Sequence, residues 1–595
     1  MPFCPHCGHQ VAEGIQFCTH CGKALAQSPL PDKFQAPWQP YQPPPPRRGW
    51  LVWLAAALGL AVVAGASVAA YLLFFGPTPK QLFLAAQARY VVDSLKEVEG
   101  ALGPLLPMQQ RMEKEPFQST VKLSADFNLN ETVPQAEQVR SLLKQSSLVV
   151  NAQRDPAADR QLTELKLNVR GGELLSAEFY QSPEELALKV PILHDKYLHL
   201  ENRDLRSAFQ SKGIPWTGPN RILTRKDYQT HLTLDPAKYL PVVKEYAGYV
   251  TEFIHDDEVT LEKNYRYASP DGEVKAKRVT LTLTEERVKE FFVGLGRKFK
   301  DDEQALDLVV ANTSGIATLM LESGSVSGPD RKQLERLRDK EYVRQSIQEG
   351  VEEWEAEWGR LRLPQGLTIA LVLDGRNRLV QEEIRMTVVG EGDAEADVAI
   401  TLTRWDGKDA KDRSLLVTVR ESKGDEVALE WKSHTTPSGA DGQTTRTSVK
   451  AWETKGNRQE AVLQANVTTT LTKGVESGKD KRTADFAFES TPKEPAVSGS
   501  LSTVHSSQAS GNRFESLSTL NLTIDPRNTY EPKVTLTFNT DSAVEFGVSP
   551  AFPTFSATNS LNLNRMSRGE FNGLMLELQR AAERFVMKNA TLFMN

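Results

Sequence analysis

The sequence predicts a multidomain protein with a small zinc ribbon, one transmembrane helix and an α+β exterior domain, dominated by antiparallel β-sheet with a few long amphipathic helices. Three observations predict this fold class. All four cysteines of the 595-residue chain lie within its first 21 residues, the stretch from 49 to 76 carries no charge, and alternating apolar and polar residues recur after residue 117. The predicted parts are a ribbon at 1–25, a proline-rich linker at 26–48, a membrane helix at 49–76, a first exterior lobe at 77–300 and a second at 301–595.

The four cysteines form two copies of the phrase Cys-x-x-Cys-Gly, separated by ten residues. This spacing predicts one structural zinc ion bound by the thiolates of Cys4, Cys7, Cys18 and Cys21. The segment between the two phrases has few apolar residues, so the metal has to supply the folding energy. Two disulfides are the alternative, and the repeated phrase favours zinc over them. A redox-active pair is disfavoured because no βαβ pattern surrounds either phrase.

The uncharged stretch from Gly49 to Gly76 is long enough to span a bilayer with some tilt. Trp50 and Trp53 at one end and Tyr71 near the other suit the two membrane interfaces. A cleaved signal peptide is the alternative interpretation. It fits poorly, because the apolar stretch begins near residue 49 and is much longer than the apolar core of a signal peptide.

Redox chemistry predicts the orientation of the chain. Zinc thiolates survive in a reducing cytosol, and residues 77–595 contain no cysteine that could be oxidised. We therefore expect a single-pass protein of the cell membrane, with a cytoplasmic N-terminus and an extracellular C-terminal domain.

Charge limits the partners that this chain can bind. The net charge of the whole chain is −6 and residues 1–48 carry +2, so the remainder carries −8. A chain with this excess of acidic residues lacks the basic surface that contacts to phosphate require. We therefore do not expect it to bind nucleic acid. The expected partners are the membrane, a cytoplasmic protein for the ribbon, and a cell-wall component or hydrophobic ligand for the exterior.

The layout resembles the zinc-ribbon-containing single-pass envelope proteins of Gram-positive bacteria. The resemblance is carried by the phrase CPHCG near the N-terminus, the proline-rich spacer and the uncharged span, so it covers residues 3–22 and about 49–76. It implies a location in the cell envelope, and it says little about activity, because many unrelated exterior domains follow the same N-terminal arrangement.

Helical periodicity predicts four amphipathic helices in the exterior. These run from Lys80 to Leu102, from Glu285 to Phe299, from Asp330 to Leu361, and onward from Ser567. Thr284 is expected to cap the second helix, and Ser567 with Glu570 forms a capping box for the last. Trp354 and Trp358 are interpreted as core residues.

Strict alternation from Val121 to Leu129, and in many later segments, predicts an antiparallel meander with one face on a core and one in water. Broad sheet beside a few helices loosely resembles the lipoprotein-carrier fold, in which a curved sheet surrounds an apolar cavity. Most of that likeness lies in residues 177–201.

The sequence offers no catalytic motif, so no enzyme is predicted. None of the six histidines beyond residue 22 forms HExxH, and neither a GxSxG phrase nor a P-loop is present. The run from His255 to Glu258 could bind a metal, although a solvated acidic turn is the favoured interpretation. Glu352-Glu353 and Glu382-Glu383 are interpreted as exposed carboxylates.

The function that these observations predict is that of a membrane-anchored bacterial cell-envelope protein, with a cytoplasmic structural zinc ribbon and a non-enzymatic binding or sensing exterior. One alternative is a tethered carrier or sensor of a hydrophobic ligand, which would need an apolar cavity larger than packing requires. A second alternative is an anchored cell-wall hydrolase, which would need a cleft with converging catalytic groups.

Overall fold

The computed structural model describes residues 78–590 apart from 103–104, 131–133, 217, 233–235, 324–328, 391–394, 423, 440–441, 457, 476–478, 491–494, 507–510 and 528–530. The chain divides into two compact units, Met1–Ala61 and Val62–Asn595, and all described residues belong to the second. The predicted zinc ribbon, linker and membrane helix therefore lie outside the described residues.

Twenty strands of the described chain form one sheet. In chain order they are β1 (Phe117–Leu129), β2 (Ser146–Asp155), β3 (Arg160–Val169), β4 (Gly172–Gln181), β5 (Glu185–Lys189), β6 (Tyr197–Glu201), β7 (Val259–Ser269), β8 (Gly272–Leu283), β9 (Leu367–Leu373), β10 (Leu379–Val389), β11 (Glu395–Asp406), β12 (Lys411–Glu421), β13 (Glu426–Ser438), β14 (Gly442–Lys455), β15 (Arg458–Val475), β16 (Lys479–Glu489), β17 (Ala496–Ser506), β18 (Arg513–Asp525), β19 (Val534–Phe546) and β20 (Ser560–Asn562).

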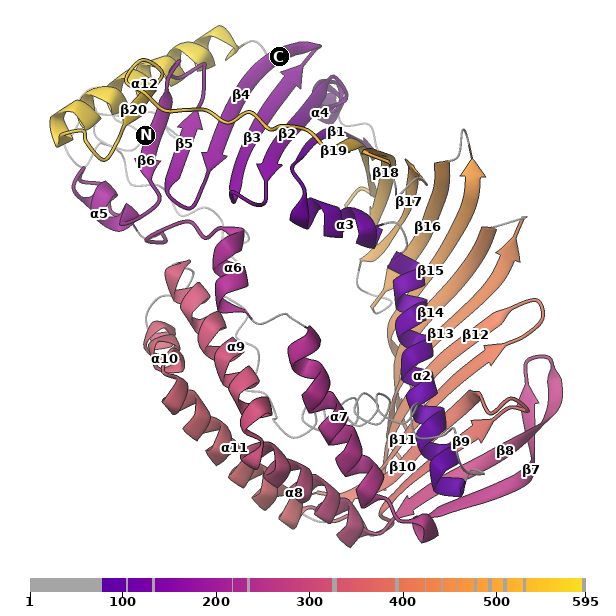
Figure 1. Ribbon diagram of the computed structural model, residues 1–595. Helices are drawn as coiled ribbons and strands as arrows, with labels where there is room; N and C mark the ends of the chain where they lie inside the picture. The colour runs from indigo at the N-terminus through magenta and orange to yellow at the C-terminus, as the bar shows by residue number, and fades with distance from the viewer. Residues whose placement is uncertain are drawn as a thin grey trace, which may run out of the picture. The chain divides into compact units, whose positions relative to one another are not determined.

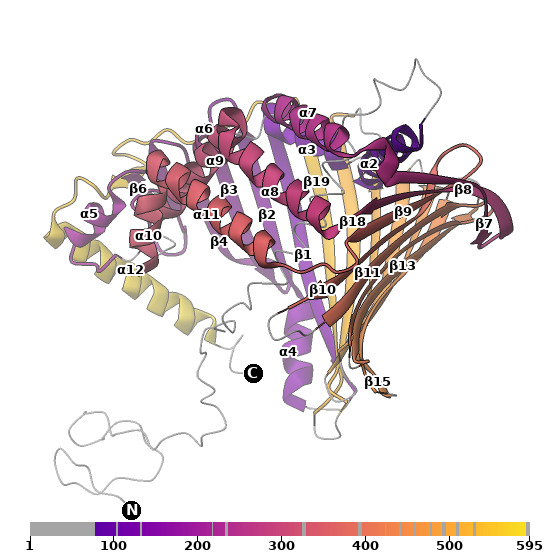
Figure 2. The same ribbon diagram turned by 90° about the horizontal axis from the view of Figure 1, so that it is seen from below.

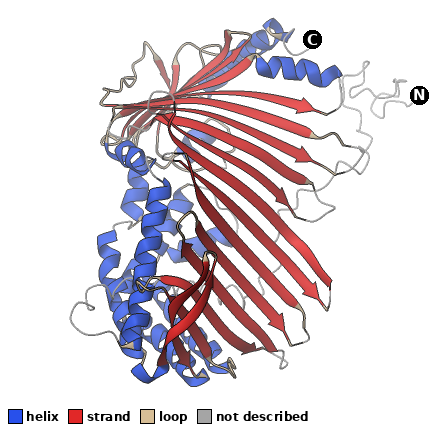
Figure 3. Ribbon diagram, turned by 90° about the vertical axis from the view of Figure 1, so that its right-hand side faces the viewer, coloured by secondary structure: helices blue, strands red, loops and turns tan. Residues whose placement is uncertain are grey.

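The sheet consists of two meanders joined through one long pair of strands. Strands β1 to β6 pair in chain order and form the first meander. Strands β7 to β19 pair in chain order and form the second, which includes the pair of β8 with β9. Strand β19 returns to pair with β1 along its whole length, from Phe117 opposite Phe546 to Leu129 opposite Val534. All pairs are antiparallel except β20 with β6. Figure 3 shows the strands as one continuous sheet.

The predicted fold class, an α+β exterior domain behind one transmembrane helix, is wrong. The described chain is a 20-stranded, almost wholly antiparallel sheet to which the helices attach. Alternation was recognised in many of the strands from the sequence, but alternation does not encode the pairing of β1 with β19, which lies far along the chain. The domain boundaries at residues 25, 48, 76 and 300 stay predictions.

The helices of the described residues fall mainly before β1, between β6 and β9, and after β20. They are α2 (Pro79–Leu102), α3 (Leu105–Lys114), α4 (Pro134–Lys144), α5 (Leu205–Gln210), α6 (Arg225–His231), α7 (Pro236–Phe253), the 3₁₀ turn η1 (Asp256–Glu258), α8 (Glu285–Asp301), α9 (Glu303–Glu322), α10 (Pro329–Leu337), α11 (Lys340–Arg360) and α12 (Arg568–Lys588).

Two of the predicted helix starts are confirmed. The Thr284 hydroxyl accepts a hydrogen bond from the backbone N–H of Arg287 at the start of α8. Ser567 and Glu570 form the reciprocal capping box of α12. The long helix predicted from Asp330 to Leu361 is wrong, because Asp339 accepts hydrogen bonds from two backbone N–H groups and begins a new helix, α11.

Helices α8, α9 and α11 pack on one another through aromatic and aliphatic side chains. The ring of Phe292 on α8 stacks on Trp358 of α11 with 3.8 Å between ring centroids, which confirms the core role predicted for Trp358. Leu306 and Val310 of α9 form a buried cluster with Val343 of α11. Among the described helices, α9 is the one that is long and apolar enough to cross a membrane. Core helices pass the same test, and the contacts of Leu306 and Val310 are those of a core helix.

Helices α2 and α3 lie on one face of the sheet and α4 lies on the other. Figure 1 shows α2 and α3 on the inner side of the curved sheet, and Figure 2 shows α4 beside β1. Arg140 and Lys144 of α4 form ion pairs with Asp126 of β1. The two faces therefore meet different neighbours, and their side chains differ as well.

Candidate functional site

One face of the sheet is apolar across almost all of its strands. Residues directly opposite in neighbouring antiparallel strands point to the same side, so the register identifies each face. We call the side that carries α2 and α3 the apolar face. One row across it, from β13 to β1, is Trp431, Val449, Ala465, Phe488, Val497, Ile524, Val534 and Leu129.

The opposite face is polar. A row across the same strands, from β14 to β1, is Thr444, Thr470, Thr483, Ser502, Thr519, Asn539 and Ser124. Hydroxyl groups on this face bond across strands, as between Thr444 and Thr470 at 3.2 Å. The polar face thus has the composition of a solvent-exposed surface, and the apolar face has the composition of a surface shielded from water.

The apolar face is nevertheless only partly covered. Leu501 keeps 38% of its surface exposed and Phe538 keeps 41%. Other large apolar side chains of this face that are exposed are Leu123, Leu165, Phe179, Leu188, Val419, Val427, Leu429 and Phe488. Large apolar side chains that stay exposed together on one face of a sheet are typical of a binding surface.

Helix α2 covers the apolar face over β7 to β10. Gln87 of this helix donates a side-chain hydrogen bond of 2.5 Å to Glu382 of β10, and both side chains are buried. Glu97, about three turns further along, accepts hydrogen bonds of 2.8 Å from Arg404 and from Arg413. These polar contacts fix α2 at one place on a face that is otherwise apolar.

Helix α3 covers the apolar face at the ends of β1, β18 and β19. Its Met108 and Met112 pack against a buried aromatic cluster of Phe117, Phe514 and Phe546. The guanidinium of Arg111, on the same helix, lies 4.2 Å from the centre of the Phe546 ring.

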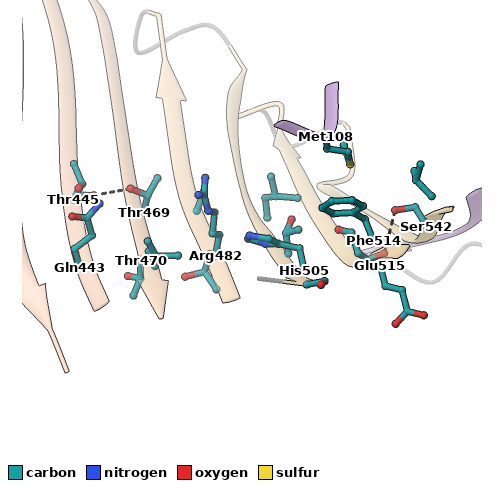
Figure 4. Close-up of a pocket in the computed structure, with 18 residues that line it drawn as sticks. Met108, Gln443, Thr445, Thr469, Thr470, Arg482, His505, Phe514, Glu515 and Ser542 are labelled. Carbon is teal, nitrogen blue, oxygen red and sulfur yellow. Dashed lines mark hydrogen bonds between the residues drawn. The ribbon is translucent and has the colours of Figure 1, made fainter. Parts of the chain in front are cut away.

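A hollow of about 570 Å³ opens on the apolar face beside α3, across β14 to β19. We call it the hydroxyl hollow, because Thr and Ser side chains from these strands line much of it (Figure 4). Thr445, Thr469, Thr503, Ser516 and Ser542 supply the hydroxyl groups, and Leu471, Leu501, Phe514 and Met108 supply apolar contact. Its lining thus combines apolar and hydrogen-bonding side chains.

Two basic side chains, Arg482 and His505, also line the hydroxyl hollow. Burial lowers the pKa of His505, the nearby Arg482 guanidinium lowers it further, and Asp480 acts in the opposite direction. His505 is consequently a neutral imidazole at neutral pH, able both to donate and to accept a hydrogen bond. The hollow can therefore hold a polar group next to apolar surface.

The predicted zinc ligands Cys4, Cys7, Cys18 and Cys21 lie outside the described residues. Within the described part of the chain, no group of three or more His, Cys, Asp or Glu side chains is placed to bind a metal ion. The run from His255 to Glu258 forms the turn η1, where Glu258 accepts from the backbone N–H of His255 and pairs with Arg287 at 2.6 Å. The interpretation of this run as an acidic turn fits its structure.

Of the two carboxylate pairs, the prediction for Glu382 is wrong. Its side chain is buried beneath α2, whereas the adjacent Glu383 points to the other face and pairs with Arg385. The hydroxyl hollow was not predicted either. Its signal in the sequence is Thr and Ser replacing Leu and Val at matching ends of successive strands, which is visible only once the register is known.

A zinc-ribbon domain family matches residues 3–25, so the chain carries a zinc-ribbon domain at its N-terminus, of a class that binds zinc. No curated protein matches the chain. The family match covers the four cysteines and none of the sheet.

Several solved structures are similar to the sheet. OccK5 (OpdH) of Pseudomonas aeruginosa is 7% identical, with 73% of this chain and 98% of that chain covered, at a TM-score of 0.20. The outer membrane protein OpdK of Pseudomonas aeruginosa is 9% identical (72% and 99% covered, TM-score 0.19), and OccAB4 of Acinetobacter baumannii is 6% identical (73% and 99%, 0.19). At these TM-scores the likeness carries no argument about function.

The predicted location is corrected by the same comparison. We expected a single-pass protein of the cell membrane with a cytoplasmic N-terminus and residues 77–595 outside the cell. The described chain instead forms one large sheet, and the solved structures similar to the chain include an outer membrane protein. The Gram-positive envelope family and the lipoprotein-carrier fold likewise find no support.

Proposed function

We propose that the sheet is a non-catalytic binding module for a small amphipathic molecule, whose apolar part lies on the apolar face. The observation that carries this proposal is the set of partly exposed Leu, Val and Phe side chains that gather on the apolar face, next to a hollow lined by hydroxyl groups. Apolar walls with a few convergent polar groups are the usual lining of a small-molecule site.

Free energies favour a ligand that makes both kinds of contact. Fully burying a Leu or Phe side chain gains about 1.5–3 kcal/mol, so covering the exposed two-fifths gains roughly 1 kcal/mol per side chain. Five such side chains would gain about 5 kcal/mol, comparable with the lower estimates of the cost of immobilising a ligand. An apolar molecule alone would therefore bind weakly, and polar anchoring is needed for useful affinity.

A solute channel is the competing function for a large sheet, and the polarity of the faces argues against it. Strands that enclose a water-filled pore present polar side chains to the pore and apolar ones outward. Here the side on the inner curve, which carries α2 and α3, is the apolar one, and the opposite side bears Thr, Ser and charged residues. An apolar inner side suits the binding of an apolar ligand better than it suits a water-filled pore.

The direct test is to extract the purified full chain with organic solvent and to identify any co-purifying molecule by mass spectrometry. A lipid-like molecule present at about one per chain would support the proposal. A chain that carries none, and that also takes up none from added lipid, would contradict it.

We propose further that Cys4, Cys7, Cys18 and Cys21 bind one structural zinc ion. The support is the Cys-x-x-Cys spacing together with the zinc-ribbon match, which spans all four residues. Such an ion would stabilise the ribbon fold and would take no part in binding on the sheet.

A further inference from the structure

A second hollow, of about 530 Å³, opens on the other side of α3 at the edge of the apolar face. We call it the arginine pocket, because Arg154 of β2, Arg160 of β3 and Arg225 of α6 line it. Met112 and Phe117, which belong to the cluster beneath α3, also line this pocket. The arginine pocket and the hydroxyl hollow therefore flank the same helix.

Arg154 lies on the apolar face, opposite Phe117 on one side and Gln161 on the other. Among the residues that the structure describes, none forms an ion pair or a side-chain hydrogen bond with it. Burial lowers the pKa of Arg154 and the charge of Arg225 lowers it further, whereas Asp159 acts in the opposite direction. A partly buried cation without a bound counter-charge is what an anion would stabilise.

Arg160 lies on the opposite face of the sheet from Arg154, because it is paired in register with Asp155. Its guanidinium lies 4.9 Å from the centre of the Phe552 ring and one terminal nitrogen lies 3.4 Å from Asp155. The remaining Nε–H is buried and has no hydrogen-bond partner in the described part of the chain. This guanidinium therefore packs against Phe552 and takes no part in an anion site beside Arg154.

The acidic groups of the pocket are already engaged. Arg225 donates to the backbone carbonyl of Glu113 and lies 3.6 Å from its carboxylate. Asp159 accepts a hydrogen bond of 3.0 Å from the backbone N–H of Lys226. These contacts leave Arg154 as the group that still needs an anionic partner.

We propose that the arginine pocket binds the anionic head, a carboxylate or phosphate, of an amphiphile whose apolar chain lies on the adjoining apolar face. This inference rests on the proposed function and assigns the charge of the ligand. From Arg154 the same side of β2 continues with Ala152, Val150 and Leu148. The exposed Leu165 and Phe179 lie on the same face in β3 and β4, so apolar surface begins next to the arginines.

Arginine is suited to this role because its planar fork matches two oxygens of a carboxylate or phosphate. Charged hydrogen bonds of this kind contribute enough to change affinity by about tenfold or more. They would provide the polar anchoring that contact with apolar side chains alone does not supply.

The test is calorimetric titration of the full chain with three probes: dodecyl phosphate, dodecyl maltoside below its micelle concentration, and inorganic phosphate. We expect Arg154→Gln to weaken dodecyl phosphate about tenfold and to leave dodecyl maltoside unchanged, which also shows that the variant is folded. Arg154→Lys keeps the positive charge but lacks the planar fork of arginine. Its affinity for dodecyl phosphate should lie between that of the wild type and that of Arg154→Gln. The matched control Arg376→Gln removes an exposed arginine between β9 and β10 and should change nothing.

The outcomes separate this inference from the proposed function. If both amphiphiles bind and Arg154→Gln weakens neither, the anion site is wrong and the proposed function stands. If neither amphiphile binds, the proposed function fails and the headgroup site fails with it. If inorganic phosphate binds through Arg154 as tightly as dodecyl phosphate does, the pocket is a site for a free anion and the headgroup assignment is overturned.

Discussion

The side-chain amide of Gln87 donates a hydrogen bond of 2.5 Å to the carboxyl group of Glu382, joining α2 to β10 beneath a layer of apolar contacts. Only 4% of Gln87 and 6% of Glu382 are exposed. Burial raises the pKa of Glu382, and the hydrogen bond from Gln87 only partly opposes that rise. A carboxyl group is thus enclosed where the sheet is otherwise apolar.

This burial predicts how stability depends on pH. Because the pKa of Glu382 in the folded chain lies above its ordinary value of 4.5, folding favours the protonated form. The contribution of Glu382 to stability is therefore complete below pH 4.5 and is lost as the pH rises through the folded-state pKa. Glu382→Gln has no proton to lose, so its thermal midpoint should exceed that of the wild type at pH 8 and match it near pH 4.

The neighbouring Glu383→Gln serves as the control for this prediction. Glu383 lies on the opposite face and pairs with Arg385 at 2.5 Å. Its removal should leave the difference in stability between pH 4 and pH 8 close to that of the wild type. A Glu382→Gln variant that loses stability between pH 4 and pH 8 as much as the wild type would contradict the assignment.

Gly499 of β17 predicts a second effect on stability. A Cβ atom there would lie 2.6 Å from Cζ of Phe486 on the neighbouring strand and 2.2 Å from the backbone oxygen of Asn521. Since the backbone oxygen cannot move without disturbing the ladder, Gly499→Ala should destabilise the sheet by about 1–3 kcal/mol. Gly172→Ala, where the nearest contact is 3.9 Å away, should cost much less in the same urea titration.

The ribbon predicts a metal-dependent fold. The peptide from Met1 to Leu25 should bind one zinc ion, and Cys7→Ser should abolish both tight binding and ordered structure. Zinc content by elemental analysis and the NMR spectrum of the peptide measure the two effects. A peptide that stays ordered after chelation, or that contains paired disulfides, would overturn the assignment.

Local structure was readable from the sequence where the physics is local. The caps at Thr284 and Ser567 were predicted because a side chain bonds backbone N–H groups only two or three residues away. The break at Asp339 carried the same kind of signal, but the apolar periodicity continues through it and concealed the cap. Periodicity alone therefore predicted the helical region correctly and its continuity wrongly.

The sheet and the candidate site depend on long-range pairing, which the sequence does not encode locally. Alternation shows that Leu123 and Ser124 face opposite sides, but not that β1 lies beside β19. Nor does it show what covers a face. Glu382 was predicted to be exposed because nothing near it in sequence places α2 above it. In the same way, nothing near Leu501 in sequence indicates that its side chain stays 38% exposed.

Two leucines on opposite faces of the same region test the central claim, that the apolar face binds an amphipathic ligand. Leu501 is 38% exposed on the apolar face, and Leu517 on the adjacent strand β18 is 52% exposed on the polar face. The measurement is fluorescence titration of the full chain with dansyl-labelled undecanoic acid, comparing the wild type with Leu501→Asp and Leu517→Asp. We predict that Leu501→Asp weakens binding of the probe about tenfold or more, because a carboxylate must be desolvated beneath the apolar chain of the ligand. Leu517→Asp should change the affinity for the probe less than about twofold. Equal effects of the two substitutions, or a wild-type chain that binds no probe, would contradict the claim.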